Sequence, residues 1–312
     1  LKGRGQIVNN AGANGIVASS GRFLAYSGDP STTLETVSGY DKRYNTAATY
    51  NPAGTTSMFL YRVAPTLTIS ANSKTRVYGD ANPSLDGSAT GFIDGDTAAS
   101  VNIAYTTTAV ANTPVSASPV TITPTATNNQ NYTLSIGNGS LTITPRPLTV
   151  TAIGQNRAYD GTTVANVSFT DNRISGDSLT ISNSSASFAS KNVGIGKTVS
   201  VSGINISGAS AANYSANTTA STTADITARP LTVSASAQNR VYDGTSAATV
   251  TLSDNRISGD VLTLGSTSAS FADKNVGTAK TVSVSGITLT GADAANYSAN
   301  TTASTTADIT AR

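Results

Sequence analysis

Hydrophobic and polar residues alternate with a period of two along most of this chain. In the stretches 148–152, 179–182 and 199–202, Leu, Val, Ile or Ala alternates with Thr or Ser. Successive side chains of a β-strand point to opposite faces, so this pattern predicts strands with one buried and one solvated face. No stretch shows a convincing helical period, and we therefore expect an all-β chain.

Turn residues separate the alternating stretches at short intervals. Asp160-Gly161, the triplet 175–177 (Ser-Gly-Asp) and Ser207-Gly208 are examples. Gly can adopt a positive φ, and Asp and Asn bond to their own backbone in turns. The spacing leaves room for roughly six to eight short strands in each stretch of about 83 residues. This is typical of a small antiparallel β-sandwich or a β-grasp-like module, and the pattern alone does not separate the two.

The C-terminal half consists of two copies of one domain. Residues 146–228 and 229–311 align without a gap, and many differences exchange one apolar residue for another, such as Phe169 for Leu252. A diverged third copy precedes them: "TRVYGD" at 75–80 stands where "NRAYDG" stands later, and "LTITPR" at 141–146 matches "ADITAR". A repeat of this length indicates tandem modules, each with its own core.

The first residues have a different rhythm. Apolar pairs at 7–8, 16–17 and 23–24 recur about eight residues apart among Gly, Asn and Ala, which favours the stacked coils of a β-helix. Prolines and tyrosines then interrupt the pattern, as in an irregular cap. We therefore predict four segments: the end of a β-helix and its cap (1–64), then module 1 (65–146), module 2 (147–229) and module 3 (230–312).

Composition argues against an enzyme and against a nucleic-acid-binding protein. The chain has no His, no Cys and no Trp, and Glu35 is its only glutamate. The commonest general base and metal ligand and every Ser-His-Asp arrangement are therefore missing. The net charge is +2, with Lys and Arg spread singly, unlike the basic patches that bind nucleic acid. The chain has no run of eighteen apolar residues, so its sequence predicts no transmembrane segment. Because the chain starts at Leu1 and ends at a repeat boundary, we expect it to be a piece of a longer protein.

The stretch "QNRAYDGTT" at 155–163 recurs as "QNRVYDGTS" at 238–246. Asp-Gly is a turn dipeptide, and the simplest interpretation is that the preceding Tyr packs at a sheet edge. The alternative is a ligand-binding role for Tyr159 and Tyr242, since a Tyr ring can stack on a sugar. These two tyrosines are the candidate ligand-binding residues; no catalytic, cofactor-binding or metal-ligating residue is predicted.

Two other recurring motifs carry polar chemistry. "DNRISGD" places Asp171 and Asp177 near the amide of Asn172, and such oxygens raise calcium as a cofactor, although the spacing is not that of an EF-hand loop. Asp and Asn before Gly also simply cap turns. Lys191-Asn192 suggests the Lys–Asn isopeptide bonds of some bacterial surface domains, but the sequence nominates no buried acidic partner. Apart from the calcium alternative, no cofactor is expected.

Several of these motifs together resemble a known family. "GRFLAYSGDP" with "SGYDKRYN" and "FLYRVAPTLTI" is similar to the end of the β-helix in filamentous-haemagglutinin-like adhesins of two-partner secretion. "RVYGDANPSLDG" with "NYTLSIGNGSLTITPRPLTV" resembles their MBG module of the Tyr-Gly type, and "NRAYDGTT" with "DNRISGD" and "KTVSVSG" resembles their YDG module, which is present twice. The resemblance covers nearly the whole chain.

The resemblance implies an extracellular or outer-surface fibre that an outer-membrane partner exports and that serves cell adhesion, aggregation or biofilm matrix. The lack of Cys fits such export, because a periplasmic disulfide would obstruct threading. The leading hypothesis is therefore a non-enzymatic adhesin fragment that acts as an extended stalk, in contact with polysaccharide or with a host or neighbouring cell surface. Two alternatives stay open: the modules bind polysaccharide themselves, or they self-associate into an extracellular filament through open strand edges.

Overall fold

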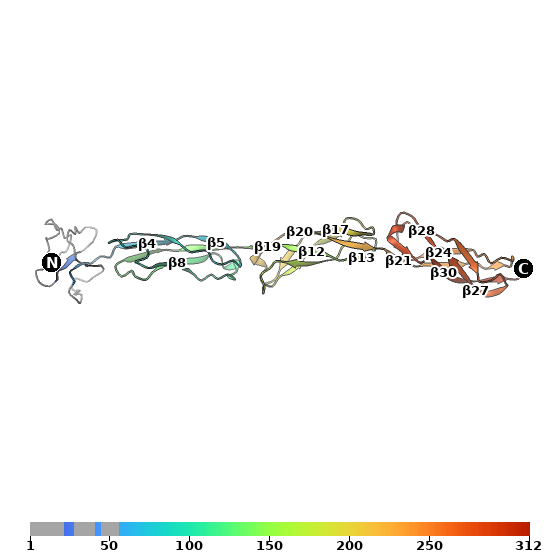
Figure 1. Cartoon of the computed structure of the whole chain (residues 1–312), viewed down its shortest axis with the longest axis horizontal. Helices are drawn as coiled ribbons and strands as arrows, with labels where there is room; N and C mark the ends of the chain where they lie inside the picture. Colours follow the sequence, from blue (N-terminus) through green and yellow to red (C-terminus); the bar gives the residue numbers. More distant parts are fainter. Residues whose placement is uncertain (1–21, 28–40, 45–55) are drawn as a thin grey trace. The chain divides into compact units, whose positions relative to one another are not determined.

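The computed structural model describes residues 22–27, 41–44 and 56–312. Its regular structure is almost entirely β-strand, with three 3-10 turns of three residues each in the described part, and this confirms the predicted all-β class. The chain forms two compact units, one of residues 1–146 with 212–214 and the other of 147–211 with 215–312. The colours of Figure 1 follow the sequence, and module 3 is in orange and red.

Three short strands precede module 1. They are β1 (Leu24–Ser27), β2 (Asp41–Arg43) and β3 (Met58–Tyr61). β3 lies between β1 and β2 and pairs with both in parallel. A buried cluster of Ala25, Tyr44, Phe59 and Tyr61 packs behind them. Parallel pairing is typical of a β-helix, but a β-helix stacks its coils in chain order, and these strands do not follow chain order. Most of segment 1–64 lies outside the described residues, so the β-helix stays a prediction.

Module 1 contains two facing sheets. Its elements are β4 (Thr66–Ala71), β5 (Lys74–Val77), β6 (Gly87–Thr90), β7 (Ile103–Thr107), η3 (Val115–Ala117), β8 (Val120–Ala126), β9 (Thr133–Gly137) and β10 (Gly139–Thr144). The strand orders are β5-β10-β8-β7 and β6-β4-β9. Leu67 and Ile69 of β4 pack against residues of β7, β8 and β9, so the core lies between the sheets. Two packed sheets favour the β-sandwich alternative.

Modules 2 and 3 have the same elements, offset by 83 residues. In module 2 these are β11 (Arg146–Leu148), β12 (Val150–Gly154), β13 (Arg157–Ala158), β14 (Val167–Asp171), β15 (Thr180–Ser182), β16 (Ser185–Phe188), β17 (Gly194–Ser202), β18 (Asn205–Ser207), η4 (Ala211–Asn213), β19 (Tyr214–Ala216) and β20 (Thr219–Thr227). In module 3 they are β21 (Arg229–Leu231), β22 (Val233–Ala237), β23 (Arg240–Val241), β24 (Val250–Asp254), β25 (Thr263–Gly265), β26 (Ser268–Phe271), β27 (Gly277–Ser285), β28 (Thr288–Thr290), η5 (Ala294–Asn296), β29 (Tyr297–Ala299) and β30 (Thr302–Thr310).

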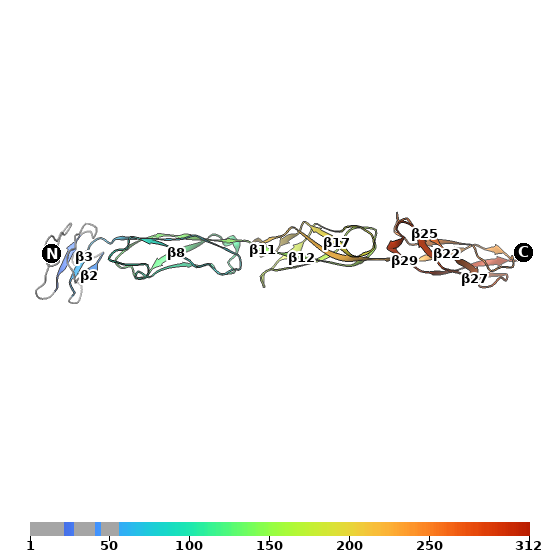
Figure 2. The same ribbon diagram turned by 45° about the horizontal axis from the view of Figure 1, so that its top comes forward.

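The principal sheet of each repeat has four strands. Its order is β13-β20-β17-β16 in module 2 and β23-β30-β27-β26 in module 3, and two-stranded sheets such as β22-β24 accompany it (Figure 2). The predicted alternation is confirmed: Leu148, Val150 and Ala152 are buried, as are Val199 and Val201, while the Thr and Ser residues between them are exposed. The apolar residues of these strands therefore form the core of the module.

The prediction of purely antiparallel modules is wrong for the strands near the module ends. β4 pairs in parallel with β9, β5 with β10, and β13 with β20, as β21 does with β29 and β23 with β30. Side-chain alternation identifies the buried face of a strand but carries no information on its direction relative to its neighbour. A strand near the start of each module lies beside a strand near its end, and both run the same way.

The connection between modules 2 and 3 has no slack. Strand β20 ends at Thr227 and β21 begins at Arg229, so a single residue lies between the last strand of one module and the first strand of the next. Pro230 lies inside β21, which is paired with β29 of module 3. Because the connecting residues belong to module 3's own sheet, the two modules are held in contact, and this contact contains the candidate site.

Candidate functional site

The recurring Arg-x-Tyr-Asp-Gly motif forms a tight turn at the end of module 2. The Asp160 carboxylate accepts hydrogen bonds from the backbone N–H of Thr162 (2.9 Å) and from its hydroxyl (2.8 Å), and it pairs with Arg157. The guanidinium of Arg157 lies over the ring of Phe188, 5.2 Å from its centroid. Gly161 has φ = +79°, a conformation that other residues rarely adopt. This local geometry makes Asp160 and Gly161 turn residues.

The motif tyrosine lies at the contact between modules 2 and 3. The backbone N–H of Tyr159 bonds to the carbonyl of Thr227 (2.9 Å), which extends the parallel pairing of β13 with β20 by one residue. Its side chain is fully buried. The hydroxyl donates to the carboxylate of Asp260 (3.0 Å), and the ring meets that of Tyr297 edge-on, with centroids 5.5 Å apart. In this arrangement the protein itself occupies both the face and the hydroxyl of Tyr159.

Asp260 is the centre of the contact, and its side chain is 4% exposed. The carboxylate accepts from the hydroxyls of Tyr159 and Tyr297 (2.6 Å) and from the ammonium of Lys191 (3.2 Å). Burial alone would raise the pKa of Asp260, but the bonds from Tyr297, Tyr159 and Lys191 outweigh it and hold that pKa below its usual value. The carboxylate is therefore charged, and module 2 supplies two of its three donors.

Lys191 reaches from module 2 to the edge of this cluster. Its ammonium is 3.4 Å from the carboxylate of Asp293, in addition to its bond with Asp260, and it lies 5.8 Å from the centre of the Tyr159 ring. The Tyr159 hydroxyl and the Asp260 carboxylate raise the pKa of Lys191. We call the group of Lys191, Tyr159, Asp260 and Tyr297 the module joint.

A backbone contact accompanies the module joint. The N–H of Val193 in module 2 donates to the side-chain carbonyl of Asn296 in module 3, at 2.9 Å. Asn296 is buried, and it is the last residue of η5, directly before Tyr297 of β29. A buried, directional bond to the backbone fixes the register of the contact, because a shift of one residue would leave the amide of Asn296 without its partner.

The first unit contains the same chemistry in a different sequence context. Lys42 and Tyr44, next to module 1 in this unit, both bond to the carboxylate of Asp94. Beside it, the hydroxyl of Tyr132 donates to Asp96 (2.7 Å) and accepts from the N–H of Ile93 (3.1 Å). In module 3 the hydroxyl of Tyr297 likewise accepts from the N–H of Ile257 (3.0 Å) while it donates to Asp260. Two carboxylates thus share the role that Asp260 has alone: Asp94 binds the Lys and the Tyr of the preceding segment, and Asp96 binds the Tyr of module 1.

The first unit also repeats the ring contact of the module joint and the backbone contact beside it. The ring of Tyr78 meets that of Tyr214 edge-on, with centroids 5.7 Å apart and an interplanar angle of 75°. The N–H of Val115 donates to the side-chain carbonyl of Asn213, at 2.9 Å. These are the same residue types as the pairs Tyr159–Tyr297 and Val193–Asn296. Tyr78 occupies the position of the motif tyrosine in module 1, so its burial follows the same rule.

Tyr242, the other predicted ligand-binding candidate, has a different environment. It is the counterpart of Tyr159 in module 3, and its ring packs on the edge of the core formed by Phe271, Val282 and Ile309. The side chain is only partly buried, whereas that of Tyr159 is fully buried. The structure therefore separates two tyrosines that the sequence treats as equivalent, and a ligand role for Tyr242 stays a prediction.

The motif Asp-Asn-Arg forms the same set of hydrogen bonds in both repeats. Nε of Arg173 donates to Asp171 at 2.8 Å, and Nη1 of the same side chain donates to the carbonyl of Leu179, also at 2.8 Å. The side chain of Asn172 accepts from the N–H of Thr149 (2.8 Å). The bonds from Arg173 hold the pKa of Asp171 below its usual value. Arg173 thus occupies the carboxylate considered for calcium, and a cofactor role for calcium stays a prediction.

Within residues 22–27, 41–44 and 56–312, no three His, Cys, Asp or Glu side chains are grouped so that they could hold a metal ion. In the same residues no helix has the length and apolar character to cross a membrane.

Comparison with family models assigns the modules. The model of the YDG domain matches residues 144–224 and 227–307, together just over half of the chain, and the model of the MBG domain (YGX type) matches residues 67–142. The chain belongs to the YDG domain family. The predicted content of one MBG module and two YDG modules in tandem is confirmed.

Solved structures similar to the YDG chain include a titin tandem and a cadherin fragment. The I9–I11 tandem of titin is 10% identical, over 79% of this chain and all of that one, with a TM-score of 0.20. Drosophila N-cadherin EC1-4 is 8% identical, over 81% of this chain and 78% of that one, with a TM-score of 0.26. Scores this low carry no argument about structure or role. The search of curated proteins gave no match.

In the YDG modules, sequence reasoning found Tyr159 but did not connect it with its partners. Asp260 is the counterpart of Asp177, which the sequence suggested for calcium, and Lys191 was considered for an isopeptide bond. The buried acidic neighbour that the sequence could not nominate for Lys191 is Asp260, more than sixty residues away. The signal that could have linked them is joint recurrence: Tyr, Lys and Asp all recur with the same offset in the second copy.

The buried hydroxyls of the YDG and MBG modules predict alkaline sensitivity. Burial first, and then the bond to Asp260, raise the pKa of Tyr297 to about 12, and burial and Asp96 raise that of Tyr132 to about 12. Unfolded tyrosine ionises near pH 10. Because the folded pKa is raised, the stability from these hydroxyls is complete below pH ~10 and is lost as the pH rises towards 12.

We expect an alkaline titration of tyrosinate absorbance to show a late component in the native chain. Tyr297→Phe and Tyr132→Phe should each remove one group from it. Titration of the urea-unfolded chain, in which all tyrosines ionise together, is the control. A late amplitude that neither replacement changes would show that other tyrosines account for it.

Proposed function

We propose that this chain is a non-enzymatic segment of a large secreted or surface adhesin. In this proposal the MBG and YDG modules form a stalk that continues the end of a β-helical shaft and serves attachment, aggregation or biofilm matrix. MBG and YDG domains occur in surface adhesin-like proteins. An outer-membrane secretion partner would export the chain to the cell surface or the medium, and polysaccharide or another cell would be its contact.

The module joint is the observation that carries the proposal. The most distinctive motif of the repeat, with Tyr159 at its centre, is used to couple one module to the next, and the side chain of Tyr159 is fully buried there. Modules that served as independent receptors would gain nothing from burying this motif against each other. A stalk requires such coupling, because it must transmit position and force from one module to the next.

The composition supports the non-enzymatic part of the proposal. A chain without His and Cys and with one Glu has few groups that titrate near neutral pH. The titratable groups of the module joint are all engaged with one another, since Asp260 takes donors from Tyr159, Tyr297 and Lys191. The pKa of Asp260 is lowered and that of Lys191 raised. These directions keep both groups charged at neutral pH, which suits an ion pair better than proton transfer.

The test is a binding and assembly experiment on the chain of residues 1–312. It would be titrated against a panel of bacterial and host polysaccharides, with calcium or a chelator present, and its mass would be followed by light scattering. A monomer that binds no glycan, with or without calcium, is expected for a stalk. Saturable binding to one glycan would favour receptor modules, and mass that grows with concentration would favour a self-assembling filament.

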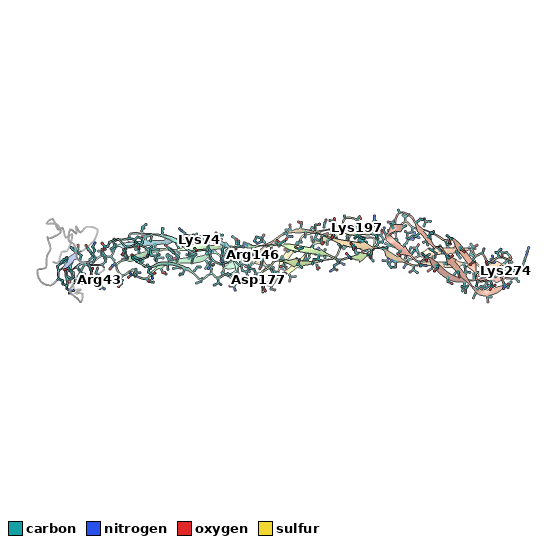
Figure 3. All side chains as sticks on the ribbon, viewed as in Figure 1. Arg43, Lys74, Arg146, Asp177, Lys197 and Lys274 are labelled. Carbon is teal, nitrogen blue, oxygen red and sulfur yellow. The ribbon has the colours of Figure 1, made fainter. Side chains whose placement is uncertain are left out.

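Polysaccharide binding is a second candidate function, and one hollow in the first unit favours it. Its volume is about 380 Å³, within the range of small-molecule sites. The lining is mostly polar and comes from β2, β3 and module 1: Asp41, Lys42, Arg43, Met58, Asp96, Asn128, Gln130, Asn131 and Tyr132. Carboxylates, amides and a guanidinium are groups that can bond to sugar hydroxyls. If glycan binding is found, Gln130→Ala and Asn131→Ala should weaken it, while Lys74→Ala, on β5, should not (Figure 3).

A further inference from the structure

The C-terminal end of module 3 presents the surface that module 2 uses in the module joint. Tyr242, Lys274 and Val276 are the counterparts of Tyr159, Lys191 and Val193. Tyr242 is partly buried while Tyr159 is completely buried, and Val276 is 54% exposed. Figure 3 shows Lys274 at the end of module 3 near the C-terminus of the chain. The three residues are called the module 3 end below.

We propose that the module 3 end is a docking surface for a further module of the same repeat, one that carries an Asp and a Tyr at the positions of Asp260 and Tyr297. The occupant is defined by its chemistry. It carries a carboxylate that accepts from a tyrosine hydroxyl, beside an Asn whose side-chain carbonyl accepts from a backbone N–H. The proposal rests on the geometry of the module joint and not on the adhesin role, so each can fail without the other.

The backbone of the module 3 end already has the docking geometry. The N–H of Tyr242 bonds to the carbonyl of Thr310 at 2.9 Å, as Tyr159 does to Thr227. β23 pairs with β30 in the register in which β13 pairs with β20. Arg240 lies over the ring of Phe271 at 5.1 Å, as Arg157 lies over Phe188 at 5.2 Å. The surface is therefore formed without its occupant, and docking requires no rearrangement of the turn.

Apolar groups at this end are left in contact with water. Val276 is 54% exposed, whereas its counterpart Val193 is half-buried in the contact between modules 2 and 3. Tyr242 is only partly buried. An exposed valine and a partly exposed tyrosine ring give an occupant apolar area to cover, which favours association in water. In module 2 the corresponding tyrosine is covered by the ring of Tyr297.

The charge of the module 3 end fits the same occupant. In the described part of the chain Lys274 has neither an ion pair nor a hydrogen bond from its ammonium, whereas Lys191 contacts both Asp260 and Asp293. The neighbouring Asp273 does not neutralise Lys274, because its carboxylate is bound to Lys280 and to the N–H of Asn275 (2.8 Å). A carboxylate on the occupant would therefore meet an unpaired cation, as Asp260 does.

The experiment compares lysine reactivity in the chain as it is and in a chain with one more copy of residues 230–312 after Arg312. Amine acetylation is followed residue by residue by mass spectrometry. In the chain as it is, Lys274 should react several-fold faster than Lys191, because the ammonium of Lys191 is held by the carboxylates of Asp260 and Asp293. With the extra copy, the rate at Lys274 should fall to that at Lys191, and Tyr242 should be protected from iodination.

A matched control changes the Asp of the extra copy that corresponds to Asp260 to Asn. Hydrogen exchange shows whether each added copy is folded. The proposal predicts that the folded Asn version returns the rate at Lys274 most of the way to its value in the unextended chain. A folded extra copy that leaves Lys274 and Tyr242 as reactive as before would overturn the proposal. Equal reactivity of Lys191 and Lys274 in the unextended chain would also overturn it, because the module joint would then not exist in solution.

Discussion

Tyr159→Ala is expected to lower the free energy of unfolding of modules 2 and 3 by about 4 kcal/mol. The side chain is fully buried, its ring packs edge-on against Tyr297, and its hydroxyl bonds to Asp260. Truncation removes the ring, leaves a cavity between the modules and takes one donor from a buried carboxylate. These losses add, because the remaining strands on both sides of the contact are fixed by their own sheets and cannot close the gap.

The matched control is Tyr242→Ala, which removes the same side chain at the same place in the repeat. Its ring is partly exposed and its hydroxyl has no partner in the described part of the chain, so we expect a loss of only about 1 kcal/mol. Urea unfolding followed by tyrosine fluorescence gives both values. Hydrogen exchange in 257–262 and 296–299 localises the effect of Tyr159→Ala to the contact. Equal losses for the two variants would show that the motif tyrosine acts within its own module only.

Sequence reasoning predicted the buried faces but not how the strands pair. The alternation of Leu148, Val150 and Ala152 with Thr identified a buried face, and the structure confirms it, although Leu148 ends β11 and Val150 begins β12. The parallel pairing of β13 with β20 was missed, because residues 157 and 226 are brought together by the whole module between them. Periodicity is a local property, while strand order and direction follow from long-range packing.

The candidate site was even less accessible to the sequence. Tyr159 and Asp260 are 101 residues apart, in different copies of the repeat. Within one copy, Tyr, Lys and Asp appear as three unrelated motifs that suggest a sugar platform, an isopeptide bond and calcium. Only the contact of one module's end with the next module's start brings them together. A repeat unit that is complete in sequence is therefore incomplete as a site, and each site belongs to a pair of modules.

The module joint depends on residue types more than on a fixed sequence. Lys42 and Tyr44 precede module 1 in a segment unlike the repeats, and yet they bond to Asp94 as Lys191 and Tyr159 bond to Asp260. A buried carboxylate is costly without partners, and at the buried Asp260 these are Lys191 and Tyr159 of the preceding module. Asp94 is exposed, so it depends less on its partners. Without a neighbouring module, the loop that carries Asp260 would be exposed, and water would solvate its carboxylate at a lower cost. The carboxylate is therefore buried in an ordered contact only when the preceding module supplies the Lys and the Tyr.

Asp260→Ala is the second replacement with a large expected effect, a loss of about 3 kcal/mol in the free energy of unfolding of modules 2 and 3. It leaves the hydroxyls of Tyr159 and Tyr297 without their acceptor in a buried contact and Lys191 with only Asp293 as a counter-ion. Asp260→Asn keeps an acceptor of the same shape and should cost less. The matched control is Asp243→Ala, whose half-exposed carboxylate bonds only within its own turn; its replacement should cause a much smaller loss than that of Asp260.

The pH dependence separates the charge of Asp260 from its packing. The folded pKa of this carboxyl is lowered, so the stability it contributes is present above its unfolded pKa, about 3.9, and is lost as the pH falls through its folded pKa. Urea midpoints of the parent chain and of Asp260→Asn should therefore differ near pH 7 and converge below pH ~4. A difference that is unchanged in acid would mean that Asp260 is needed for its shape alone. Lys191→Ala should then weaken the contact no more than Lys274→Ala, since a neutral centre would not need the cation.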